Sequence, residues 1–439
     1  MSEPEESVMS APRLKEDIRI APFENGSHDR GLYLVEVGDA CLVVNEALHG
    51  VLLALRECPE TLEELARIYE LRTGQKVSVE VLSDLLSSRI PESLFSHTPY
   101  PAHKTPFIFS VRLIPERLVR PLSSVLSLLF SKWVVIPVLC AFVAAEYWVF
   151  SESVSAIHHK FQPADLPLLY LALIGSTLFH ELGHAAACRR YRCPHGDIGF
   201  ALYFIYPAFY TDVTKTWRLT PRRRAVVDIG GVYFQCILIV ALAIYVSLSG
   251  SLFALRIIWL TQLALFFTLN PIFKMDGYWL LSDLSGLTNL HKQMRETLAC
   301  AFGRLTGRPA ASSLRGARLK VLYAYVTLVA LYSLYLAQYL FYSVREVVLY
   351  YPAQARWLVG FIRAAWQDGD STTALRGVGW LAYVSVWPLL LSVILFFMLL
   401  RLTRACARGP LGRALAARVH TRRGGRVESD AGAAHVTAA

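Results

Sequence analysis

Long runs of apolar residues constrain this chain more than any other feature of its sequence. Hydrophobic residues make up 54% of the 439 residues and charged residues only 18%, which is few for the surface of a soluble protein of this length. A helix needs about 20 apolar residues to cross roughly 30 Å of hydrocarbon. Runs of that length predict transmembrane helices near 126–150, 167–188, 225–248, 252–270, 319–343 and 378–400.

Basic residues beside these runs predict the orientation of the chain. The segments 189–224, 271–320 and 401–439 each contain eight Lys or Arg residues, whereas 151–166 contains one and 344–376 contains four. Because basic loops stay in the cytoplasm, both termini are expected there. The net charge of +10 therefore reflects topology, and no basic face interleaved with aromatic residues indicates binding to nucleic acid.

Ahead of the first run, residues 19–97 predict a small cytoplasmic α+β domain. Two β-prone runs, Leu32–Val37 and Cys41–Val44, flank Gly38-Asp39 and predict a hairpin. Three short helices are then expected to follow capping residues, which are Asn45, Thr61 and Ser78. This order is typical of a winged-helix-like domain.

The expected fold is therefore a polytopic α-helical membrane protein of about six spans, preceded by that domain. Residues 126–402 form the expected membrane domain, and 98–125 are expected to be a linker. The polar segment 1–18 and the basic, Ala/Gly/Arg-rich segment 403–439 are expected to be disordered tails.

The strongest chemical signal lies at the end of the second run, in Phe179-His180-Glu181-Leu182-Gly183-His184. On a helix, His180 and His184 lie four residues apart on one face, so both imidazoles can bind one metal ion. Glu181 lies beside them and can take a proton from water that the metal activates. The alternative is a pair of interfacial histidines with a snorkelling glutamate. Such a cluster of ionisable groups at the end of an apolar run is costly, which favours a functional role.

Zinc bound by two histidines needs a third protein ligand and an open position for water. The candidate is Asp276, in Asn270-Pro271-Ile272-Phe273-Lys274-Met275-Asp276-Gly277-Tyr278. The predicted topology brings this segment to the membrane face at which the second run ends. Pro271 ends a helix and Gly277 permits a turn that aims the carboxylate inward. The alternative for Asp276 is a solvated Asp-Gly turn.

The two motifs together resemble the site-2 protease family of intramembrane zinc metallopeptidases, most closely its bacterial peptide zinc metalloprotease members. The resemblance covers about residues 165–290 and implies that the spans lie in the inner membrane of a bacterial cell. It implies that His180, His184 and Asp276 bind Zn2+ and that Glu181 is the general base. It also implies that Asn270 orients the substrate or the oxyanion, although the spacing from Asn270 to Asp276 is shorter than in the best-known members.

Between the motifs, residues 197–212 are rich in β-prone aromatic residues and too interrupted for a span. A β-hairpin at the membrane surface occupies this position in the family that the chain resembles. An exposed strand there can bind an extended peptide by strand addition. Tyr210 and Asp212 are candidates to face the site and bind substrate, and an interfacial aromatic belt is an alternative explanation for the tyrosines.

The N-terminal domain resembles the PqqD-like modules that bind leader peptides of ribosomally made, modified peptides. The residues behind this resemblance are LYLVEVGDACLVVNEAL and TLEELARIYE. It implies capture of a leader-bearing precursor peptide, and the alternative is a structural or regulatory domain. The expected function is that of an intramembrane zinc endopeptidase. A non-catalytic membrane component of a peptide maturation or export complex is the alternative. A zinc transporter is disfavoured, because only one metal-binding constellation is visible.

Overall fold

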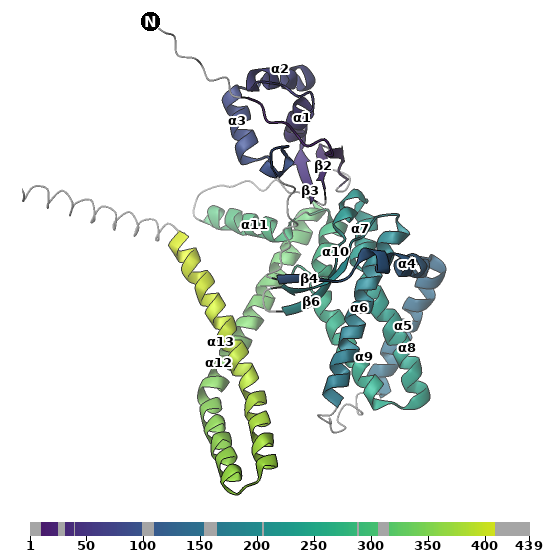
Figure 1. Cartoon of the computed structure of the whole chain (residues 1–439), viewed down its shortest axis with the longest axis vertical. Coiled ribbons are helices and arrows are strands. Elements are labelled where there is room, and N and C mark those ends of the chain that lie inside the picture. The colour runs from purple at the N-terminus through teal and green to yellow at the C-terminus, as the bar shows by residue number, and fades with distance from the viewer. Residues whose placement is uncertain are drawn as a thin grey trace, which may run out of the picture. The chain divides into compact units, whose positions relative to one another are not determined.

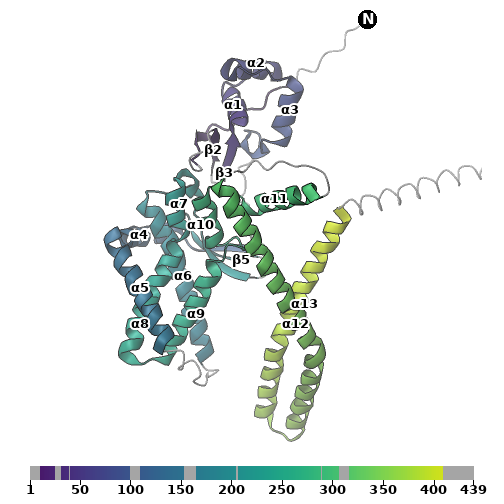
Figure 2. The same ribbon diagram turned by 180° about the vertical axis from the view of Figure 1, so that it is seen from behind.

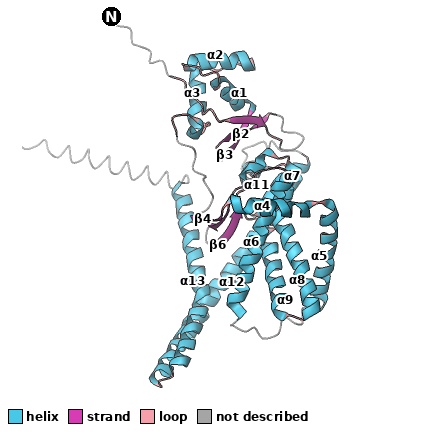
Figure 3. Ribbon diagram, turned by 45° about the vertical axis from the view of Figure 1, so that its right-hand side comes forward, coloured by secondary structure: helices cyan, strands magenta, loops and turns pink. Residues whose placement is uncertain are grey.

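A computed structural model describes residues 10–24, 31–38, 40–98, 109–152, 165–203, 206–287, 289–305 and 316–408. The chain divides into two compact units, Met1–Ala324 and Tyr325–Ala439. Figure 1 shows the elements of both units in chain order, and Figure 2 shows them from behind. Helices dominate, and the strands gather into two small sheets (Figure 3).

The first sheet belongs to the N-terminal module, which we define as residues 10–98. Its antiparallel strands are β1 (Arg19–Pro22), β2 (Leu32–Val37) and β3 (Ala40–Asn45), in the order β1-β2-β3. The helices α1 (Glu46–Leu55), α2 (Leu62–Thr73) and α3 (Val79–Ser88) follow, and then the 3-10 helix η1 (Glu92–Leu94). The predicted hairpin and three helices are thus confirmed, whereas β1 was not predicted.

Local hydrogen bonds explain where the three helices begin. Asn45 Oδ1 accepts from the backbone N–H of Leu48 at 3.0 Å, and Thr61 Oγ1 accepts from that of Glu64 at 3.1 Å. Ser78 Oγ plays the same role for Val81 at 3.4 Å. Each helix contributes an apolar face to one shared core, which includes Val35, Leu52, Leu65 and Leu82.

Residues 10–18 differ from the expected disordered tail. The backbone N–H of Ala11 donates to the carbonyl oxygen of Glu60 at 3.0 Å, and that of Lys15 donates to Leu94 at 3.1 Å. Ile18 is only 2% exposed and belongs to the core of the module. The physical reason is that Leu14 and Ile18 are apolar residues within a polar segment, and both pack on the core. Residues 1–9 of the expected tail lie outside the described residues.

The segment 98–125, expected to be a linker, contributes a strand and a helix. The strand β4 (Phe109–Ile114) pairs with β5 (Ile198–Tyr203), which pairs in turn with β6 (Tyr206–Thr211). All three strands are antiparallel. The predicted hairpin over 197–212 is therefore confirmed, and a third strand from far away in the sequence extends it. The helix α4 (Glu116–Leu126) and the 3-10 helix η2 (Ser127–Phe130) then lead into the membrane domain.

The membrane domain is built around a bundle of helices that lie side by side in Figures 1 and 2. These are α5 (Lys132–Glu152), α6 (Leu166–Arg190), α8 (Gly230–Ser249) and α9 (Leu252–Thr268). Shorter elements connect them or follow them, namely η5 (Thr214–Arg218), α7 (Pro221–Asp228), α10 (Asp276–Ser285) and α11 (Leu290–Leu305).

The second unit contains most of α12 (Ala317–Gln367). It also contains α13 (Ser371–Arg408), the last described helix of the chain. The two helices form a hairpin in which the Tyr351 and Ser385 hydroxyls lie 2.8 Å apart. Residues 355–366 are continuous with the expected span 319–343 inside α12. Helix α13 extends into the expected tail as far as Arg408, and residues 409–439 lie outside the described residues.

Five described helices are long and apolar enough to cross a membrane: α5, α6, α8, α12 and α13. The predicted span at 252–270 corresponds to α9, which has 17 residues. At 1.5 Å per residue α9 is about 25 Å long, slightly less than the hydrocarbon thickness of about 30 Å. The structure therefore supports five of the six predicted spans by length and composition.

Candidate metal centre

Helix α6 brings His180, Glu181 and His184 into the interior of the membrane domain. Each of the three side chains is buried, with exposures of 6%, 7% and 7%. The two histidines lie one turn apart, and their Nε2 atoms are 3.1 Å from each other. The prediction that both imidazoles face one point is therefore confirmed.

Asp276 is the first residue of α10 and reaches the same point from the other side. Its Oδ2 atom lies 3.0 Å from His180 Nε2 and 3.2 Å from His184 Nε2. The turn after α9 makes this approach possible, because a Cβ atom at Gly277 would lie only 2.0 Å from the carbonyl oxygen of Leu269. The structure thus joins the two motifs that the sequence separates by about ninety residues.

Three observations show that these residues fit a metal ion. The three potential ligand atoms lie within 4.8 Å of one another. Asp276 Oδ2 is buried, and in the described contacts the two histidine Nε2 atoms are the groups that approach it. His184 Nδ1 lies 2.7 Å from the carbonyl oxygen of Val227, so its proton sits there and the Nε2 lone pair faces the centre. Tetrahedral zinc holds N and O ligands roughly 3.3–3.6 Å apart, close to these separations.

Electrostatics favour an ionised carboxylate at this position. Burial by itself would raise the pKa of Asp276. The neighbouring His184 and His180 outweigh burial and hold that pKa well below its ordinary value. A deprotonated carboxylate is the form that binds a metal ion.

Glycines let the helices approach the metal centre closely. A Cβ atom at Gly231 of α8 would lie 2.4 Å from His180 Nε2, and one at Gly183 of α6 would lie 2.3 Å from the carbonyl oxygen of Gly230. These contacts make α8 one wall of the site. A larger residue at Gly231 would occupy the space of the imidazole.

Glu181 is held by a residue that the sequence did not single out. The Oγ1 atom of Thr211, at the end of β6, donates to Glu181 Oε2 at 2.8 Å and also lies 2.9 Å from the Glu181 carbonyl oxygen. Thr211 is itself buried. The only signal available in the sequence was its place on the predicted hairpin beside two candidates, Tyr210 and Asp212.

The expectation that Tyr210 and Asp212 face the site differs from the structure. Side chains alternate along a strand, so residues 210 and 212 lie on the face opposite Thr211. The ring of Tyr210 covers Gly199, where a Cβ atom would lie 2.5 Å from Tyr210 Cε1. Asp212 Oδ1 accepts from the backbone N–H of Thr214 at 3.0 Å and from its hydroxyl at 2.7 Å. A role of either residue in substrate binding stays a prediction.

Asn270 lies in the turn between α9 and α10. Its Oδ1 atom accepts from the backbone N–H of Ile272 at 3.0 Å, which stabilises the turn that leads to Asp276. The nearby His291 of α11 lies with its Nε2 atom 3.0 Å from the carbonyl oxygen of Ile272. The role of Asn270 toward a substrate or an oxyanion stays a prediction.

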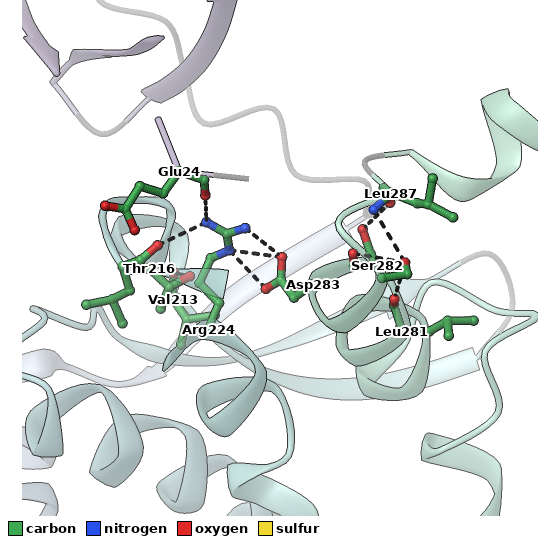
Figure 4. A network of polar contacts seen from close by, with 10 residues as sticks. Glu24, Val213, Thr216, Arg224, Leu281, Ser282, Asp283 and Leu287 are labelled. Atoms are coloured by element: carbon green, nitrogen blue, oxygen red, sulfur yellow. Dashed lines mark hydrogen bonds and ion pairs between the residues drawn. The ribbon is translucent and has the colours of Figure 1, made fainter. Parts of the chain in front are cut away.

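Behind the centre, α7 packs on α10 through buried charges. Figure 4 shows the guanidinium of Arg224 against the carboxylate of Asp283, with Nε–Oδ1 and Nε–Oδ2 distances of 2.9 and 3.0 Å. Asp228 lies in the same interface. Burial, reinforced by the charges of Asp283 and Asp276, raises the pKa of Asp228 to about 9.

Comparison with known proteins bears on this site. No family model matches the chain, and no solved structure matches it. The chain is 28% identical over 116 residues to the "Putative peptide zinc metalloprotease protein YydH" of Bacillus subtilis (strain 168). The match covers 26% of this chain and 46% of that relative, so it spans about half of the relative's length. Together with the convergence of His180, His184 and Asp276 on one point, it supports a relationship to zinc metalloproteases.

Proposed function

We propose that this protein is a zinc endopeptidase that hydrolyses peptide bonds at or within the membrane. The observation that carries the proposal is the convergence of His180, His184 and Asp276 on one point, with the carboxylate of Glu181 on the same helix turn. The similarity to a relative named as a peptide zinc metalloprotease supports the same chemistry.

A zinc ion held by the three side chains would supply Lewis acidity and would make water acidic enough to ionise near neutral pH. Glu181 then accepts the proton of the attacking water on its carboxylate and delivers it to the amide nitrogen of the leaving peptide. Thr211 holds Oε2 of Glu181 in place during this transfer. His180, Glu181 and His184 are each buried, which limits the access of bulk water to the reacting groups.

The sheet beside the site supports an extended substrate. Its edge strands are β4 and β6, and β6 ends at Thr211, which contacts Glu181. A peptide bond in a helix is shielded from attack, so a strand added to this sheet would present the bond in an accessible conformation.

The substrate class that we propose is a precursor peptide delivered from the cytoplasm. Within the described part of the N-terminal module, β3 pairs only with β2, which leaves an edge to which a leader segment can add. The basic loops favour a cytoplasmic module and a site open to the cytoplasm of a bacterial cell. Partners in peptide maturation or export would then act beside this protein.

A non-catalytic role in such a complex is the competing proposal. Glu181 argues against it, because a structural zinc site closes its coordination shell and has no need of a general base. The decisive experiment measures zinc content and cleavage of candidate precursor peptides for the wild type, Glu181→Gln and Asp276→Ala. We expect Glu181→Gln to retain zinc without cleavage, and Asp276→Ala to lose zinc. Cleavage or export unaffected by Glu181→Gln would refute the catalytic role.

A further inference from the structure

The side chain of Arg224 connects α7 to the helix that carries Asp276. It is 3% exposed, and its Nε and Nη2 atoms both lie 2.9 Å from Asp283 Oδ1. Asp283 follows Asp276 by seven residues on α10, which places both residues on one face of that helix. The ion pair therefore holds α10 in the rotation and position at which Asp276 meets the histidines.

The same helix α7 also orients the second ligand. Val227 lies three residues after Arg224, and its carbonyl oxygen accepts the Nδ1 proton of His184 at 2.7 Å. A shift of α7 would thus disturb His184 directly and Asp276 through Asp283. Partners of this kind, one step removed from the metal, strongly influence metal affinity.

Arg224 also contacts the N-terminal module. Its guanidinium carbon lies 5.1 Å from the ring centre of Phe23, just after β1, and 5.6 Å from that of Trp217, in η5. The two rings lie 5.7 Å apart, and Phe23 is only 4% exposed. In Figure 4 the guanidinium lies between Asp283 and the carbonyl oxygen of Glu24. That oxygen lies 3.5 Å from Arg224 Nη1. A residue of the module therefore covers the Arg224–Asp283 ion pair.

Other contacts hold the module beside Arg224. Arg218 forms an ion pair with Glu36 of β2, and Lys215 Nζ donates to the carbonyl oxygen of Gly38 at 2.7 Å. These contacts involve η5 alone and do not reach α10. Arg224, in contrast, contacts both the module and α10.

We propose that Arg224 is a positioning residue that couples docking of the N-terminal module to the placement of Asp276 and His184. Aromatic rings over the guanidinium keep water from the ion pair with Asp283, and removal of water strengthens attraction between charges. The metal centre binds zinc most tightly while Phe23 lies on Arg224. The inference rests on the proposed function only in its assignment of the metal ligands.

The test is the zinc affinity of the full chain in detergent micelles, measured by competition with a chromophoric chelator and without substrate. The variants are Phe23→Ala, Arg224→Lys and Asp283→Asn. Arg256→Met is the matched control, because Arg256 forms an ion pair of the same kind with Asp165, with an Nη1–Oδ2 distance of 2.6 Å, away from α10. We expect each of the first three variants to lose affinity by about 10- to 100-fold, as for other residues that orient metal ligands. The control should bind zinc like the wild type.

Two further readouts separate coupling from general damage. The double variant of Phe23→Ala and Asp283→Asn should lose less affinity than the product of the single losses, because both act through Arg224. The visible spectrum of the cobalt-substituted protein should change in Arg224→Lys and stay unchanged in Arg256→Met. Wild-type affinity in Phe23→Ala, or losses that multiply in the double variant, would overturn the coupling. A wild type that binds zinc but cuts no peptide would overturn the proposed peptidase alone.

Discussion

Thr211 Oγ1 lies 2.8 Å from Glu181 Oε2 and 2.9 Å from the carbonyl oxygen of the same residue. The end of strand β6 is thereby fastened to the turn of α6 that carries Glu181. The contact orients the carboxylate that we assign as general base. It also places β6, an edge of the three-stranded sheet, beside the reacting groups.

Replacement of Thr211 by valine keeps the shape of the side chain and removes the hydroxyl. We expect kcat to fall by about 10- to 100-fold, because a misplaced general base loses part of its contribution to the rate. Zinc content should stay at the wild-type level, since Thr211 contacts none of the three ligands in the described contacts. Thr177→Val is the control, because Thr177 lies on α6 and donates only to the carbonyl oxygens of Leu173 and Ile174. Equal kcat values for the two variants would contradict the role of Thr211.

Gly231 is predicted to be essential for zinc binding. A Cβ atom there would lie 2.4 Å from His180 Nε2, so Gly231→Ala must displace the imidazole or push α8 away from α6. We expect its zinc content to fall to about a tenth of the wild-type value or less, as for changes that misplace a ligand. Gly175→Ala on α6 is the matched control, since a Cβ atom at Gly175 meets nothing within 4 Å. The test is the zinc content of both purified variants, measured by metal analysis. Full zinc content in Gly231→Ala would contradict the close packing of α8 against His180.

Zinc removal is predicted to destabilise the folded membrane domain. At a free zinc concentration of 100 times Kd, binding adds about 2.7 kcal/mol to the free energy of unfolding. Thermal unfolding in detergent should therefore shift to lower temperature on chelation and recover when zinc returns. In Asp276→Ala the unfolding temperature should not depend on zinc. Asp370→Ala, which removes an exposed carboxylate ahead of α13, should respond as the wild type does. A zinc-dependent shift retained in Asp276→Ala would remove that residue from the ligand set.

The orientation in the membrane is predicted from the basic loops and can be tested with cysteines. Ser251 lies between α8 and α9, on the side expected to face away from the cytoplasm, whereas the exposed Cys58 lies in the N-terminal module. A membrane-impermeant thiol reagent should label Ser251→Cys in cells whose inner membrane is intact. Cys58 should react only after lysis. The opposite pattern would place the metal centre on the other side of the membrane.

Features with a local physical cause followed from the sequence. Apolar runs predicted the long helices, since each helix must satisfy its own backbone hydrogen bonds in lipid. Asn45, Thr61 and Ser78 predicted helix starts, because a cap acts within three residues. The spacing of His180 and His184 placed both imidazoles on one face before any tertiary contact was known.

The tertiary structure decided what depends on contacts between distant segments. Strand β4 pairs with β5, which follows it by more than eighty residues in the sequence. The residues of a short strand do not indicate which distant strand it pairs with. Thr211 was missed and its neighbours were chosen, because strand alternation alone does not say which face meets α6. Val227 orients His184 through a backbone carbonyl, which any residue type supplies. The coverage of Arg224 by Phe23 likewise arises only when the N-terminal module packs beside α7.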